Sequence, residues 1–123
     1  MSAKLWSLAL LALASLALTA PGPALADPQQ YVVTYVEFKP AFKKVGGEFL
    51  EQLAFLGRHA KGAVSFSANQ EIQRESLYVL IEVWQTADYR QTFEGSDKIK
   101  DLLAKIQPLL GAPFDERPGT LIE

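Results

Sequence analysis

The eight residues LYVLIEVW, Leu77–Trp84, carry the clearest secondary-structure signal in the chain. They are rich in β-branched and aromatic side chains, which favour an extended strand. Because side chains alternate between the two faces of a strand, one face is entirely aliphatic: Leu77, Val79, Ile81 and Val83. The other face combines rings with one carboxylate: Tyr78, Leu80, Glu82 and Trp84. We expect the aliphatic face to pack against helices and the other face to point away from them.

Periodic segments on both sides of this strand predict an α+β fold. Tyr31–Phe38 has the composition of a strand, and from Pro40 apolar residues recur every three or four positions, as in an amphipathic helix. The predicted order is strand 31–38, helix 40–60, strand 63–73, strand 77–84, helix 86–93, helix 96–106 and a closing strand 120–122. This order matches the ferredoxin-like split β-α-β plan, an antiparallel sheet with helices on one face.

The first 26 residues have the pattern of a cleaved export signal. Lys4 gives a positive start, residues 5–18 form an apolar run, and Ala24-Leu25-Ala26 places small residues before Asp27. The run is shorter than the ~20 residues that cross a bilayer as a helix, so an uncleaved membrane anchor is the weaker alternative. We expect a signal peptide over residues 1–26 and one domain over residues 27–123, exported to the periplasm or secreted, with no membrane association after cleavage.

Composition excludes several classes of partner. The chain has 12 Lys and Arg against 14 Asp and Glu, a formal net charge of −2, so it lacks the basic footprint of a nucleic-acid-binding protein. It has no Cys and one His, so we expect no conventional His/Cys metal site. A domain of this length without disulfides has little margin of stability, and oligomerisation would increase that margin.

The sheet face expected to lie away from the helices is unusually apolar. It would carry three residues from each of the first and third strands: Tyr31, Val33, Tyr35, Tyr78, Leu80 and Trp84. A sheet face in water normally alternates to polar residues, and an exposed aromatic area of this size is typical of an interface. Because two-fold homodimers are the commonest oligomers, we expect a second copy to cover this face and complete a barrel.

These features together resemble the antibiotic biosynthesis monooxygenase family, whose members are dimeric α+β barrels. The resemblance rests on Val32-Val33-Thr34-Tyr35-Val36 followed by Lys39-Pro40 and the long helix. It continues through Gly62 before the second strand, Glu82-Val83-Trp84 at the end of the third, and two short helices within 86–110. The similarity covers nearly all of the chain after residue 26.

The resemblance implies a cofactor-free monooxygenase or a relative of one, since family members oxidise quinols and polyketide aromatics and many have no assigned activity. A haem-degrading branch relies on an Asn, a Trp and a His whose positions fall here on Thr34, Phe93 and Leu103. None of the three matches, so haem cleavage by that route is not expected. Many relatives place a His where Phe93 stands. Thr34 and Phe93 occupy positions that line a helix–sheet cavity in relatives, so the resemblance implies that both contact substrate; the alternative for Phe93 is a plain core residue.

Three side chains are candidates for chemistry, each with an ordinary structural alternative. Glu82 is a lone carboxylate among rings, suited to act as a general base or to form an ion pair with a Lys or Arg of a partner subunit. His59, the only His, is either a second base or a surface residue at a helix end. Trp84 is either the wall of an aromatic pocket or an anchor of the dimer interface.

The sequence therefore predicts a homodimeric monooxygenase that uses O2 and no cofactor to oxidise a small electron-rich aromatic such as a quinol. Its candidate bases are Glu82 and His59, and its substrate-binding residues are Thr34, Trp84 and Phe93. The alternative is a non-catalytic dimeric barrel that binds a small ligand.

Overall fold

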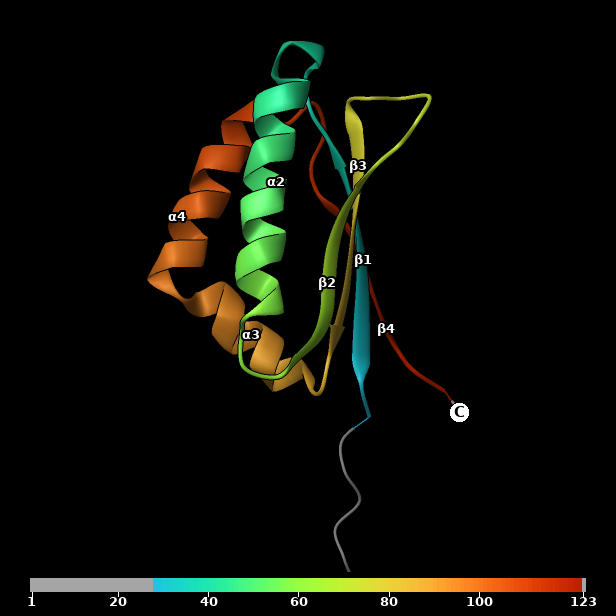
Figure 1. Ribbon diagram of the computed structural model, residues 1–123, viewed down its shortest axis with the longest axis vertical. Helices are drawn as coiled ribbons and strands as arrows, with labels where there is room; N and C mark the ends of the chain where they lie inside the picture. Colours follow the sequence, from blue (N-terminus) through green and yellow to red (C-terminus); the bar gives the residue numbers. More distant parts are fainter. Residues whose placement is uncertain (1–27, 123) are drawn as a thin grey trace, which may run out of the picture.

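The computed structural model describes residues 28–122 and shows two layers, a four-stranded sheet with helices on one of its faces (Figure 1). The strands are β1 Gln30–Glu37, β2 Ala63–Gln70, β3 Leu77–Trp84 and β4 Asp115–Thr120. The helices are α2 Lys43–Arg58, α3 Ala87–Gly95 and α4 Asp97–Ile106, with 3-10 turns at Pro40–Phe42 and Gln107–Leu109. The signal peptide predicted for residues 1–26 lies outside the described residues. None of the helices within 28–122 has the length and apolar character needed to span a bilayer.

The strand order is β2-β3-β1-β4, and every neighbouring pair is antiparallel. This arrangement confirms the predicted ferredoxin-like α+β fold. The register sets which side chains meet on each face, because directly opposed residues of an antiparallel pair point to the same side. Glu82 lies between Val32 of β1 and Phe66 of β2, and Thr34 lies between Leu80 of β3 and Glu116 of β4.

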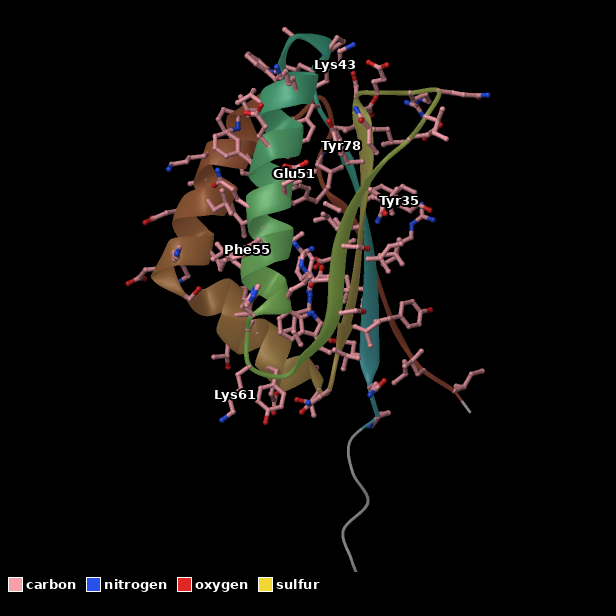
Figure 2. The ribbon with its side chains drawn as sticks, viewed as in Figure 1. Tyr35, Lys43, Glu51, Phe55, Lys61 and Tyr78 are labelled. Carbon is pink, nitrogen blue, oxygen red and sulfur yellow. The ribbon has the colours of Figure 1, made fainter. Side chains whose placement is uncertain are left out.

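The prediction for the two faces of β3 was wrong. The face that carries Tyr78, Leu80, Glu82 and Trp84 is buried under the helices. The aliphatic face points the other way, and 42% of the Ile81 surface is exposed. The β1 faces were predicted correctly, with Val32, Thr34 and Val36 covered by the helices. In Figure 2 the Tyr78 side chain projects toward α2, whereas Tyr35 projects from the opposite side of the sheet.

The physical reason is that large rings bury more area than aliphatic side chains and fill the space beneath α2. Three glycines of α2 leave room for them, since a Cβ at any of the three would overlap a ring of the sheet. The pairs are Gly46 with Phe38, Gly47 with Tyr78, and Gly57 with Phe66. The Tyr78 hydroxyl also donates a hydrogen bond of 2.7 Å to the carbonyl of Lys43, which ties the start of α2 to the sheet.

The last strand was predicted too late in the chain, at residues 120–122 instead of Asp115–Thr120. The observed β4 contains Pro118, which has no backbone N–H to donate. Because β4 is an edge strand that pairs only with β1, one side of its backbone needs no partner, and the proline is tolerated there. The second strand also ends earlier than predicted, at Gln70, where the turn into β3 begins.

Candidate functional site

A cavity of about 80 Å³ lies between the helices and the sheet. Its walls come from all four strands and from α2, α3 and α4, so the whole fold is needed to form it. Thr34, Phe93 and Leu103, the three positions that the family resemblance singled out, converge on this cavity from β1, α3 and α4. A wider groove beside α2 is open to solvent and is lined by exposed side chains such as Glu48 and Lys98. The enclosed cavity is therefore the candidate site.

Glu82 lines the cavity from β3 and is only 3% exposed. Its Oε1 accepts hydrogen bonds from Trp84 Nε1 at 2.9 Å and from Arg90 Nε at 3.0 Å. Its Oε2 accepts one from Arg90 Nη2 at 3.2 Å. The ion pair named as the alternative for Glu82 thus forms, but with an arginine of the same chain. Both carboxylate oxygens accept hydrogen bonds from charged or indole N–H groups, which fix the position of Glu82.

Arg90 joins three carboxylates on three elements. Besides Glu82 of β3, it pairs with Glu94 of α3, at 2.6 Å between Nη1 and Oε1, and with Glu116 of β4. Burial acts to lower the pKa of Arg90, but hydrogen bonds and charge from the three glutamates outweigh burial and raise it. The guanidinium therefore stays positive. With all four groups ionised, the cluster carries two more negative charges than positive ones.

Glu94 is held less firmly than Glu82. Its side chain is 41% exposed, and Arg90 is its only ion-pair partner among residues 28–122. Burial raises the pKa of Glu94, and the charges of Glu116 and Glu82 add to this rise, although Arg90 acts to lower it. The site therefore increases the proton affinity of Glu94.

Sequence reasoning missed Arg90, Glu94 and Glu116. The first two were within reach, because an Arg and a Glu four residues apart on one helix face are neighbours. Glu116 was not, since the predicted closing strand began after it, and nothing in the local sequence indicates that it faces Arg90.

Three phenylalanines line the cavity, Phe66, Phe93 and Phe114, whereas Trp84 packs beside it and is not among the lining residues. Trp84 is fully buried and lies 5.3 Å from Phe93 between ring centroids, and Phe66 lies 6.0 Å from Phe93. Trp84 thus packs under the helices and not on the open side of the sheet, so it is not the interface anchor considered above. Its indole N–H holds Glu82, which places it behind the carboxylate. Phe93 lines the cavity directly.

His59 lies away from this cluster. It is exposed at the end of α2, where its ring stacks on Phe55 at 4.5 Å and Nδ1 lies 2.8 Å from the Phe55 carbonyl oxygen. It is not among the residues that line the cavity. The structure therefore does not bring the two predicted bases, His59 and Glu82, together.

No protein-family model matches the sequence, and no curated protein matches it. Solved structures do match. A candidate antibiotic biosynthesis monooxygenase from Nitrosomonas europaea superposes with a TM-score of 0.74 at 11% identity, over 81% of this chain and 96% of that one. One from Caulobacter crescentus gives 0.72 at 18% identity, over 78% and 92% of the two chains. A Bacteroides thetaiotaomicron protein of unknown function gives 0.72 at 14% identity, over 78% and 100%.

The chain thus has the fold of structures named as antibiotic biosynthesis monooxygenases, as the sequence resemblance implied. Identities between 11% and 18% show a common fold and leave activity to be argued from the site itself.

Proposed function

We propose that this protein is an exported homodimeric monooxygenase that oxidises a small electron-rich aromatic, such as a quinol, with O2 and without a cofactor. The observation that carries the proposal is the cavity itself, in which an aromatic wall faces a buried, charge-neutralising Glu82–Arg90 pair. The apolar wall suits a ring, and the charged cluster suits the ring's hydroxyl groups. The fold shared with structures named as antibiotic biosynthesis monooxygenases supports the same function.

The chemistry requires little of the protein. A quinol that loses a hydroxyl proton becomes electron-rich enough to react with O2 directly. One oxygen atom then enters the ring and the other leaves as water, so a quinol and O2 give a hydroxyquinone and water with no external reductant. A phenolic hydroxyl has a pKa of about 10 in water, so the site must accept the proton and stabilise the anion. Arg90 supplies a fixed positive charge at the cavity for that anion.

The size of the cavity limits the substrate to one ring. A cavity of about 150 Å³ holds benzene, and this one measures about 80 Å³. A single ring therefore fits only when a wall residue moves outward, and the half-buried Phe93 is the residue that we expect to move. A polycyclic substrate would require the helices to separate from the sheet.

The proposal of a homodimer rests on the face of the sheet opposite the helices. This open face carries six apolar residues in register across β1 and β3: Tyr31, Val33, Tyr35, Val79, Ile81 and Val83. A continuous apolar area on the uncovered side of a sheet is typical of an interface, and face-to-face packing of two copies would bury it.

Oxygen uptake with a panel of one-ring quinols tests the proposal. Leu103→Phe fills the cavity from α4, and the matched control Ala104→Phe adds the same ring at the neighbouring exposed position. We expect uptake by the wild type, a loss of tenfold or more in Leu103→Phe, and little change in Ala104→Phe. Absence of uptake with every quinol, or equal loss in both variants, would contradict the proposal.

The second candidate function is a non-catalytic binding protein, and two observations favour it. No imidazole lines the cavity, and both oxygens of Glu82 are already hydrogen-bonded. Calorimetry separates the two candidates, since a binding protein would take up catechol in wild type and lose it in Leu103→Phe without consuming O2.

A further inference from the structure

The three carboxylates around Arg90 are not equivalent, and the differences identify which one is available for proton transfer. Glu82 has both oxygens occupied by hydrogen bonds and is almost fully buried. Glu94 and Glu116 also pair with Arg90, but their side chains are 41% and 44% exposed. These two carboxylates are therefore more accessible than Glu82 to a ligand that enters the cavity.

Glu94 and Glu116 both line the cavity, but only Glu94 shares a helix face with Arg90 and Phe93. Arg90, Phe93 and Glu94 are spaced i, i+3 and i+4 on α3, so one face of one helix presents a cation, a ring and a carboxylate to the cavity. A ring stacked against Phe93 would have both Arg90 and Glu94 within one helical turn. Glu116 reaches the same arginine from the edge strand β4.

We propose that Glu94 accepts the proton of a ligand hydroxyl in this cavity and that Arg90 pairs with the oxygen anion that remains. The step is an acid–base transfer. The O–H bond of the ligand breaks, the proton bonds to a carboxylate oxygen of Glu94, and the electron pair stays on the ligand oxygen. Nothing is oxidised or reduced in the step. The inference rests on the proposed function, because it names the base that a quinol oxygenase would use.

Charge explains why the transfer costs less when the proton acceptor is a member of the cluster. Adding an anion to the cluster from outside would increase the repulsion, whereas moving a proton from the ligand to Glu94 leaves the total charge unchanged. The negative charges of Glu82 and Glu116 repel the ionised form of Glu94, and burial disfavours it further. Arg90, released from Glu94, is then free to pair with the new anion.

The test uses 4-nitrophenol, a one-ring phenol whose anion absorbs visible light and whose neutral form does not. In wild-type protein we expect bound 4-nitrophenol to show the anion band at a pH below that at which the free compound ionises. In Glu94→Gln we expect the compound to bind with no such shift. Glu94→Asp keeps a carboxylate and should recover part of the band. The matched control Glu48→Gln removes an exposed glutamate of α2 outside this cavity and should behave as wild type.

Three results would overturn the assignment: failure of wild type to bind 4-nitrophenol, an unchanged band in Glu94→Gln, or loss of the band in the rival variant Glu116→Gln while Glu94→Gln retains it. Circular dichroism confirms that each variant is folded. The outcome is independent of oxygen uptake. A band that depends on Glu94 in a protein that consumes no O2 with any quinol would support Glu94 as the proton acceptor and reject the oxygenase.

Discussion

The two faces of the sheet each depart, at a few positions, from what is expected of a small protein in water. The covered face buries polar groups, Glu82 and Thr34, among aromatic rings. The open face exposes aliphatic side chains such as Ile81. Burying a carboxylate has a desolvation cost that its ion pair repays only in part, and exposing aliphatic surface forgoes hydrophobic stabilisation. The covered face therefore holds the candidate site as well as the core, and the open face is the surface on which we propose that a second copy packs.

The largest expected effect comes from breaking the ion pair on the covered face. Arg90→Met removes the cation and leaves the Glu82 carboxylate buried without its partner, which typically costs about 3–5 kcal/mol. Urea denaturation measures the free energy of unfolding. In the double variant Glu82→Leu with Arg90→Met, most of the loss should be recovered, because no uncompensated charge remains. Without that recovery, the loss would belong to packing by the arginine stem.

Arg117→Met is the matched control on the open face. Arg117 also pairs with a carboxylate through two nitrogens, but Asp115 and Arg117 are both largely exposed. Water solvates such a pair in either state, so its removal should change the unfolding free energy much less. Equal losses in Arg90→Met and Arg117→Met would remove the distinction between the two faces.

The next largest effect is expected on assembly. Ile81→Lys places a charge at the centre of the open face, and a two-fold interface would contain it twice. We expect the dissociation constant of the dimer to rise about 100-fold or more, since each desolvated lysine costs well over 1 kcal/mol. Sedimentation equilibrium measures it, with Ile72→Lys as the control, because Ile72 is 94% exposed outside the sheet. If the wild type is a monomer at working concentrations, the open face is not a dimer interface.

Sequence reasoning recovered the order of elements because each is long and periodic, and it placed β3 at the observed residues, Leu77–Trp84. It reversed the two faces of that strand because both are largely apolar, so hydrophobicity does not distinguish them. The register with β1 does, by placing Tyr78 opposite Val36 and Glu82 opposite Val32. That information is non-local and is absent from the strand itself.

The residues of the site also divide into those that the sequence predicts and those that only the fold brings together. Thr34 and Phe93 were predicted from the family resemblance, and both line the cavity. Glu82 was identified as an unusual carboxylate, but its partner was sought in another subunit, whereas Arg90 lies eight residues along the same chain. Glu116 enters the cluster only through the pairing of β4 with β1, which brings it opposite Thr34. A contact made by sheet topology leaves no trace in local spacing.

A smaller effect should follow from the close packing on the covered face. A Cβ at Gly57 would overlap the ring of Phe66, so Gly57→Ala should lower the unfolding free energy by about 1–3 kcal/mol. Gly95→Ala is the control, since no atom lies within 4 Å of its Cβ position. In that variant the better helix propensity of alanine should raise stability by up to about 1 kcal/mol. If both variants gained stability, α2 would not be in close contact with the sheet.

The smallest expected effect is on the pH dependence of the unfolding free energy, which should have opposite signs for a carboxyl on each face of the sheet. The folded state raises the pKa of Glu94 above the ordinary value of 4.5, mainly through burial. The stabilisation from its protonated form is therefore complete below pH 4.5 and is lost as pH rises through the folded pKa. The difference in unfolding free energy, wild type minus Glu94→Gln, should fall as pH increases over that window. Because 41% of the side chain is exposed, solvent screening keeps the change small.

Asp115 on the open face should give the opposite slope. A hydrogen bond from Arg117 lowers the pKa of Asp115 below its ordinary 3.8, so the stabilisation is present above pH 3.8 and is lost as pH falls through the folded pKa. The difference, wild type minus Asp115→Asn, should therefore rise with pH. Urea titrations of the three proteins between acidic and neutral pH measure both slopes. Slopes of the same sign would mean that burial and the neighbouring carboxylates do not increase the proton affinity of Glu94, and the acid–base role proposed for it would lose its physical basis.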